Sequence, residues 1–146
     1  MSTEIKKAAF SFGNLKFPNF SFEESQNPTQ GLDVELLPTG IYYQTEGRFE
    51  LKIVFSAFEP EKKSTPVIRA TVVGHFQFKE VSKIEDIPSY FYQNSVAIVF
   101  PYLRAFISNL TLQANIKMVI LPVMNLQFLE QNLRESTVTW NTPPEK

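Results

Sequence analysis

The sequence predicts an α+β domain, in which a four-stranded antiparallel sheet is followed by two main helices. Apolar and polar residues alternate through the first half of the chain, whereas apolar residues recur at three- and four-residue intervals after Val96. The 146 residues suffice for one domain but not comfortably for two. We therefore expect residues 1–146 to form a single domain, with loosely ordered tails at 1–8 and 136–146.

The first expected strand runs from about Phe10 to Phe22 and has two irregularities. The face that its apolar residues occupy changes at Gly13-Asn14 and again at Pro18-Asn19. A one-residue slip turns side chains to the other face of a sheet, so two β-bulges or two tight bends are expected there. A strand that contains proline is expected at a sheet edge.

Three further strands are expected before the helices. Apolar residues alternate with acidic ones over Leu32–Leu36, and Pro38-Thr39-Gly40 is interpreted as a turn. A regular strand over Gly47–Ala57 and its partner over Val67–Phe78 are joined by the charged connection Glu59–Ser64. Each of these two strands has one apolar and one mixed face, which favours antiparallel pairing.

The second half predicts helices. The apolar stripe of the first covers residues 96–110, with Asn94 as N-cap, and a short separate helix over Ile87–Asn94 is an additional expectation. Pro101 lies inside the stripe and should kink or restart the helix, because it lacks an N–H. A second helix is expected over Asn125–Glu135, and the tail that follows should be ordered only if Trp140 docks.

The composition argues against most kinds of chemistry. Cysteine is absent, His75 is the only histidine, and the formal net charge is −1. No nucleotide-binding glycine motif, nucleophile motif or metal-ligand cluster is present. No leader and no apolar run near 20 residues is apparent, so we expect a cytoplasmic, non-enzymatic protein without cofactor, metal, nucleic acid or membrane insertion. The 14 phenylalanines fit either a Phe-rich core or an apolar groove. The core is the commoner place for phenylalanine.

Four short motifs, in order, resemble the SecB family of export chaperones. They are Asn19-Phe20-Ser21-Phe22-Glu23, Gly74-His75-Phe76, Ile98-Val99-Phe100-Pro101-Tyr102-Leu103-Arg104, and Val119-Ile120-Leu121-Pro122-Val123. Each motif is unspecific alone, but their order and spacing agree across roughly residues 14–135.

The resemblance implies a tetramer, built as a dimer of dimers, that holds unfolded preproteins in apolar grooves without ATP. By position, the residues expected to line the groove, with ordinary core as the alternative for each, are Leu32, Val34, Leu36, Phe128, Leu129 and Leu133. The residues expected in the core or in a subunit interface are Phe100, Pro101, Tyr102, Leu103, Phe106 and Ile107.

The resemblance also implies docking of the translocase motor SecA on acidic residues of the sheet. Here Glu23 keeps the acid, Asn19 is neutral and Arg69 reverses the charge, so we expect weak SecA affinity. SecB-like chaperones also serve toxin–antitoxin modules, where they hold an aggregation-prone antitoxin, and this is the main alternative. A small apolar-ligand-binding or structural module and an enzyme built from carboxylates are the alternatives of other classes.

Overall fold

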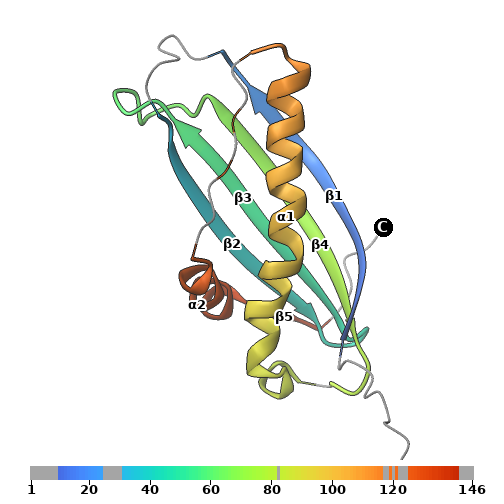
Figure 1. Cartoon of the computed structure of the whole chain (residues 1–146). Helices are drawn as coiled ribbons and strands as arrows, with labels where there is room; N and C mark the ends of the chain where they lie inside the picture. Colours follow the sequence, from blue (N-terminus) through green and yellow to red (C-terminus); the bar gives the residue numbers. More distant parts are fainter. Residues whose placement is uncertain are drawn as a thin grey trace, which may run out of the picture.

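A computed structural model describes residues 10–24, 31–81, 83–116, 119, 121 and 125–141. Over these residues four long strands precede a long helix, a shorter helix and a final short strand (Figure 1). The elements are β1 (Phe10–Phe22), β2 (Asp33–Tyr43), β3 (Arg48–Phe58), β4 (Ile68–Phe78), the 3₁₀ turn η1 (Ile84–Asp86), α1 (Ser89–Gln113), α2 (Gln127–Ser136) and β5 (Val138–Trp140).

The strands form one mixed sheet in the order β1-β4-β3-β2-β5. The four long strands are antiparallel to their neighbours, and β5 pairs with β2 in parallel. The predicted α+β class is therefore confirmed, and the predicted four-stranded antiparallel sheet is corrected to a mixed sheet of five strands. Both helices lie on one face of this sheet (Figure 1).

β1 has the two irregularities that its sequence predicts. Its register against β4 shifts between Phe12 and Leu15 and again between Lys16 and Asn19. These shifts keep its apolar side chains on the helix-covered face despite the change of parity. β1 is also an edge strand, as expected for a strand containing Pro18.

β2 corrects the prediction of a turn at Pro38-Thr39-Gly40, because the strand continues through these residues to Tyr43. Pro38 lies opposite Ile53 of β3, while β5 pairs only with residues 41–43 on the other side. The Pro38 carbonyl accepts a hydrogen bond from the Ser136 hydroxyl at 3.2 Å, so this residue faces the open edge. A missing N–H costs no ladder bond there, which is why the strand tolerates proline.

β3 and β4 form the centre of the sheet and follow the predicted alternation. Phe49 lies opposite Phe76, and the large buried side chains of both strands point to the helix-covered face, whereas Thr71 and Val73 of β4 are buried on the other face. The hairpin between β2 and β3 turns at Gly47, whose φ of +66° requires glycine. On the outer face of these strands Lys52, Arg69 and Gln77 are exposed.

α1 is one continuous helix that begins at Ser89, directly after Pro88. The prediction of a separate helix over residues 87–94, with Asn94 as N-cap of the next, is therefore wrong. Pro101 neither ends nor restarts the helix. The carbonyl that loses its partner belongs to Ala97, and both residues lie on the exposed side, where water can satisfy that carbonyl.

The C-terminus of α1 ends at an asparagine in the left-handed conformation. Asn115 has a φ of 59°, and its N–H donates to the Leu112 carbonyl at 3.0 Å. The Ile116 N–H donates to the Thr111 carbonyl at 3.4 Å, completing a Schellman motif. The chain therefore leaves α1 in a defined direction toward α2.

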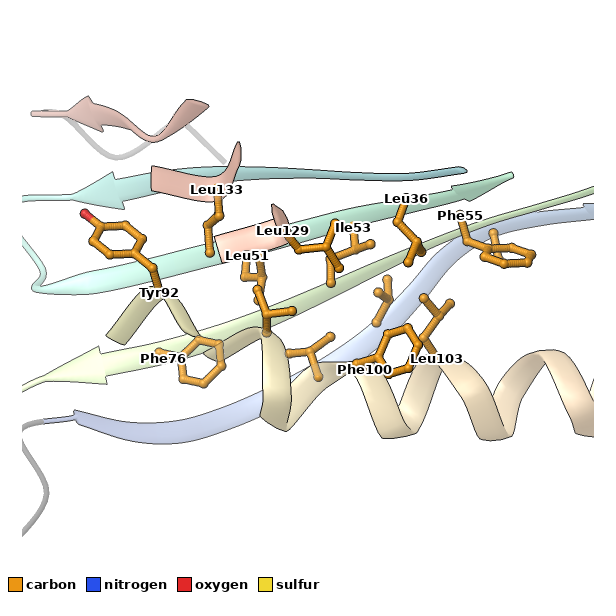
Figure 2. Packing of buried hydrophobic residues seen from close by; sticks show 14 of the residues in the cluster. Leu36, Leu51, Ile53, Phe55, Phe76, Tyr92, Phe100, Leu103, Leu129 and Leu133 are labelled. Carbon is orange, nitrogen blue, oxygen red and sulfur yellow. The ribbon is translucent and has the colours of Figure 1, made fainter. Parts of the chain in front are cut away.

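The core fills the space between the inner face of the sheet and the two helices (Figure 2). Phe91 is its aromatic centre, with ring centroids 4.8 Å from Phe10, 4.7 Å from Phe49 and 4.7 Å from Phe78. The α1 side chains Leu103 and Ile107 are fully buried in the same cluster. A Cβ on Gly74 would lie 3.0 Å from Val99, so this glycine permits the close approach of α1 to β4.

α2 confirms the second predicted helix to within two residues at its start. Residues 136–141 of the predicted tail are ordered, since residue 136 ends α2 and residues 138–140 form β5. The stated condition for order, docking of Trp140, is met: its ring lies 6.4 Å from that of Tyr43. Residues 1–8 and 142–146 of the predicted tails lie outside the described residues.

Candidate functional site

On the side of the domain formed by β2 and α2, the predicted groove residues divide between the apolar core and the surface. Leu36 is nearly buried, and Leu129 and Leu133 are fully buried beneath α2. Leu32 and Val34 are half-buried at the start of β2. Phe128, on the outer side of α2, is 49% exposed. Accessible apolar surface therefore comes from Leu32, Val34 and Phe128, and client binding there remains a prediction.

A shallow depression of about 380 Å³ lies at the start of β2. It is lined by Asp33, Val34, Glu35, Phe58 and Lys63. The Lys63 ammonium lies 3.6 Å from the Asp33 carboxylate, and both side chains are largely exposed. The depression thus combines apolar side chains from two strands with a solvated rim of charge.

α2 and β5 dock against β2 at Gly40. A Cβ at this position would lie 2.6 Å from Phe49, 2.6 Å from the Thr137 hydroxyl and 3.1 Å from Leu133. Only glycine leaves room for these neighbours, so the sequence element interpreted as a turn is instead a docking point. Sequence reasoning missed β5, and the available signal was the β-prone run Val138-Thr139-Trp140.

The exposed side of α1 is long and carries no charge. Among the 25 residues of the helix, Arg104 is the only charged one, and it is half-buried. Tyr90 and Tyr102 are each 51% exposed and Leu112 is 58% exposed. The other exposed residues along this side are small or polar, among them Gln93, Asn94, Ala97, Pro101, Ala105 and Asn109. Solvated helix faces are normally charged, so this face has the character of an interface.

By length and composition α1 could also span a membrane, although only 39% of its most apolar window is buried in the domain. The sequence prediction overlooked this segment. Its inner side, including Phe91, Val99 and Leu103, contributes to the core of the domain, and the core helix of a folded domain passes the same test of length and composition.

The residues predicted for core or interface divide between the two sides of α1. Phe100, Leu103 and Ile107 belong to the core. Pro101 and Tyr102 are exposed, which leaves them available for an interface. Phe106 lies between these classes and stacks on Phe17 of β1 at 4.0 Å.

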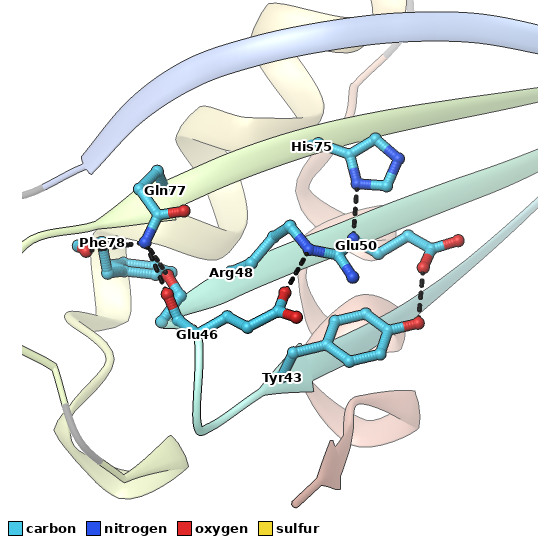
Figure 3. Close-up of polar contacts among 8 residues, drawn as sticks. Tyr43, Glu46, Arg48, Glu50, His75, Gln77 and Phe78 are labelled. Atoms are coloured by element: carbon cyan, nitrogen blue, oxygen red, sulfur yellow. Dashed lines mark hydrogen bonds and ion pairs between the residues drawn. The ribbon is translucent and has the colours of Figure 1, made fainter. Parts of the chain in front are cut away.

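The outer face of the sheet carries a polar cluster near the β2–β3 hairpin (Figure 3). The Arg48 guanidinium lies 4.0 Å over the Tyr43 ring, and its Nε donates to Glu46 at 2.9 Å. The Nη1 of Arg48 lies 2.9 Å from Nδ1 of His75. Because guanidinium only donates, Nδ1 must accept, so His75 is neutral with its proton on Nε2.

Burial lowers the pKa of His75, and Arg48 and Lys16 add to this effect, whereas Glu50 opposes it. Burial raises the pKa of Tyr43, as does the 2.9 Å hydrogen bond that its hydroxyl donates to Glu50. The cluster therefore links β2, β3 and β4 through side-chain contacts. The contacts of His75 within it are those of a structural residue.

The predicted SecA-docking residues gather at one end of the outer face. Asn19 accepts a 3.0 Å hydrogen bond from Thr71 on β4. Arg69 lies opposite Ser21 of β1 and is exposed, and Glu23 follows the end of β1. The three residues thus share a surface, while docking there remains a prediction. Across the described residues, no group of three His, Asp or Glu side chains could hold a metal ion.

Comparisons with known proteins show similarity both in sequence and in structure. The uncharacterized protein MJ0357 of Methanocaldococcus jannaschii is 32% identical over 136 residues, which cover 88% of this chain and 87% of the relative. No family model matches the chain.

Among solved structures, the Mycobacterium tuberculosis SecB-like chaperone Rv1957, in complex with a ChAD peptide from the Rv1956 HigA1 antitoxin, has a TM-score of 0.61 at 16% identity. The alignment covers 80% of this chain and 91% of that one, and it confirms the SecB-like fold. A Streptococcus agalactiae protein of unknown function gives a TM-score of 0.43 at 9% identity, too low to support an argument.

Proposed function

Because the chain belongs to the same family as the Methanocaldococcus jannaschii relative and has a SecB-like fold, we propose that it is an ATP-independent holdase chaperone. It binds unfolded or non-native polypeptides through accessible apolar side chains and keeps them from aggregating. It is a soluble cytoplasmic protein that uses no cofactor and performs no covalent chemistry.

The observation that carries this proposal is the accessible apolar surface on a SecB-like fold. Leu32 and Val34 are half-buried at the start of β2, and Phe128, on the outer side of α2, is 49% exposed. An unfolded chain exposes apolar side chains, and burying them contributes about 25 cal/mol per Å² without requiring a particular sequence. Several such contacts along one client add by avidity.

The direct test is suppression of aggregation of an unrelated unfolded protein without nucleotide. We expect the purified protein to suppress light scattering at stoichiometric concentration. The double variant Val34→Ser/Phe128→Ser should bind clients at least about tenfold more weakly, because about 1.4 kcal/mol of lost burial corresponds to that factor. Sedimentation and thermal unfolding should remain unchanged.

A matched control is Phe20→Ser, which removes a phenylalanine that is 54% exposed on β1, away from β2 and α2. This control should keep the wild-type affinity for clients. Normal binding by Val34→Ser/Phe128→Ser would show that clients bind elsewhere. Absence of suppression by the wild type would instead favour a small-ligand or structural module.

Two client pathways are compatible with this activity. The structural neighbour binds an antitoxin peptide, which supports a role in holding an antitoxin. Glu23 preserves one acid of the SecA-docking set, whereas Asn19 is neutral and engaged with Thr71. The charge reversal at Arg69 turns an attraction into repulsion, so we expect weak SecA binding and favour the antitoxin pathway.

Titration with the host's own SecA at low and physiological salt separates the two pathways. Tight binding that is lost in Glu23→Ala and strengthened in Arg69→Glu would support export. Tight binding indifferent to both changes would show that another surface docks SecA. No binding, with suppression of aggregation intact, would support the antitoxin pathway.

The proposed assembly is a homotetramer, a dimer of dimers in which the uncharged side of α1 is buried. The exposed Tyr102 and Leu112 lie on that side. Obligate interfaces of this kind bury about 2,000 Å² or more, which a helix of 25 residues can supply from each protomer together with adjoining strands.

A further inference from the structure

β5 differs from every other strand of the sheet. It has three residues, follows α2 directly, and pairs in parallel with residues 41–43 at the end of β2. The four other strands are antiparallel and have 11 residues or more. The chain thus fills the last positions of one sheet edge with its own C-terminal segment.

The attachment of β5 is slight compared with that of the core strands. All three of its residues are exposed, Val138 by 54% and Trp140 by 45%. The Gln44 N–H donates to the Trp140 carbonyl at 3.0 Å, and the Thr45 hydroxyl donates to the Asn141 carbonyl. Elements with few buried side chains open locally at low free-energy cost.

α2, by contrast, is firmly anchored, and the connection between the two elements can act as a hinge. Leu129 and Leu133 are fully buried. Thr137, the only residue between α2 and β5, is extended, with φ −70° and ψ 129°, and its hydroxyl donates to the Leu133 carbonyl at 2.6 Å. β5 can therefore leave the sheet without disturbing α2.

The edge that β5 covers suits an extended peptide. Ile41 lies opposite Val138 and Tyr43 opposite Trp140, so incoming side chains at alternate positions meet apolar surface. Leu37, 60% exposed, continues that surface along β2. Pro38 lacks an N–H and its carbonyl is bonded to Ser136, which limits backbone pairing to the segment after it.

We propose that β5 is a displaceable internal strand, and that the edge of β2 at Ile41–Tyr43 binds an extended apolar segment of a client in its place. This inference rests on the proposed function and names a backbone-pairing site for it. Backbone hydrogen bonds give affinity independent of sequence, and alternate side chains add apolar contact. The tethered strand competes at an effective concentration near millimolar, so it weakens client binding at this edge.

The direction of each backbone group provides a matched pair of variants. The Trp140 carbonyl faces β2, and consecutive strand residues present their N–H groups to opposite sides. The Val138 N–H therefore faces β2, whereas the Thr139 N–H faces outward. Val138→Pro removes a pairing donor, and its predecessor Thr137 already has the extended conformation that proline requires. Thr139→Pro removes none.

A lock is equally accessible, because the chain has no cysteine of its own. The double variant Ile41→Cys/Val138→Cys would join directly opposed residues of β2 and β5. Oxidation holds β5 in place and reduction releases it. The same protein before and after reductant controls for the loss of the Ile41 side chain.

The probe is a fluorescently labelled peptide, Ser-Thr-Val-Thr-Phe-Asn, which copies residues 136–141 with phenylalanine in place of Trp140. We expect Val138→Pro to bind it at least about tenfold more tightly than the wild type or Thr139→Pro, because the tethered competitor is gone. The oxidised lock should bind at least about tenfold more weakly than the reduced lock. Trp140, the single tryptophan, should emit at longer wavelength when β5 is released.

Equal peptide binding by the wild type, Val138→Pro and Thr139→Pro would overturn the inference. Equal binding by the oxidised and the reduced form of the lock would overturn it too. If Val138→Pro does not fold, the comparison of the oxidised with the reduced Ile41→Cys/Val138→Cys variant tests the inference by itself. Suppression of client aggregation is measured in parallel. If the wild type suppresses aggregation but all variants bind the peptide equally, the holdase function stands and this edge plays no part in it. The expected peptide pattern without suppression by the wild type retains the edge and removes the holdase function.

Discussion

At the scale of single residues, Phe91 shows how much of this core depends on one side chain. Its ring touches aromatic residues of β1, β3 and β4, which come from distant parts of the sequence. The spacing of apolar residues predicted a stripe only from Val96, so Phe91 fell in the separate short helix expected over Ile87–Asn94. The reason is that Pro88 and not Asn94 precedes the helix, which extends the stripe by a turn and a half.

Replacing Phe91 by alanine should therefore cost about 3–5 kcal/mol in the free energy of unfolding, because it removes a fully buried ring and leaves a cavity. Urea unfolding followed by circular dichroism measures this loss. Phe20→Ala, which removes an exposed ring, should cost about 1 kcal/mol or less. Similar losses for both variants would contradict the central place of Phe91.

His75 predicts how stability depends on pH. Its folded pKa is lowered below the ordinary value of 6.5, chiefly by burial, so the unfolded chain takes up the proton first as the pH falls. Stability should be full above pH 6.5 and should decrease as the pH falls below it, levelling once the folded histidine is protonated. Protonation also removes the acceptor of the Arg48 contact.

In the variant His75→Gln, the thermal unfolding midpoint should change less between pH 7 and pH 5 than in the wild type. Titration of carboxylates near the low end of this range remains in both proteins. Its control is Gln77→Ala, an exposed change in the same cluster that should preserve the wild-type slope. An unchanged slope in His75→Gln would show that other groups set the pH dependence.

At the scale of elements, periodicity predicted the strands and helices whose stabilisation comes from a buried face. The alternation over residues 49–57 and 68–78 and the bulges of β1 follow directly from which side chains are buried. Periodicity did not predict the structure at the outer edge of β2. Pro38 and Gly40 are both typical of turns, but packing requires glycine at position 40, and the open edge of β2 tolerates proline at position 38.

Gly40→Ala should therefore destabilise the docking of α2 and β5 on β2. The added methyl would overlap Phe49 and Thr137, and overpacking of this kind costs about 1–3 kcal/mol. Unfolding measures the loss, and Trp140 fluorescence reports whether β5 undocks. Gly31→Ala, where a Cβ meets nothing within 4 Å, is the matched control and should be nearly neutral.

At the scale of the whole molecule, one protomer leaves the long uncharged side of α1, which includes Tyr102 and Leu112, exposed. The candidate groove was predicted from position in the chain, and only Leu32, Val34 and Phe128 of its six members have accessible surface. Burial of Leu129 and Leu133 could not be read from periodicity, since a core helix and a groove helix have the same apolar spacing. Only the path of β2 beneath α2 distinguishes them.

The proposed tetramer predicts a sedimentation mass several times that of the 16.8 kDa protomer at micromolar concentration. Tyr102→Glu/Leu112→Glu should reduce that mass, because it places two carboxylates on an uncharged surface that assembly would bury. Gln113→Glu, an exposed change at the end of α1, should leave the mass unchanged. A monomeric wild type would contradict the proposed assembly.

The position of β5 at the end of the chain has a consequence during synthesis. Ribosomes add about 5–20 residues per second, so the end of β2 exists for seconds before residues 138–140 are made. During that interval the nascent domain presents an uncovered sheet edge to every neighbouring nascent chain. Pro38, which cannot donate a backbone hydrogen bond, lies just before that edge and limits the length over which a neighbouring chain can pair with β2. We therefore expect Pro38 to limit pairing between nascent chains until β5 has been made.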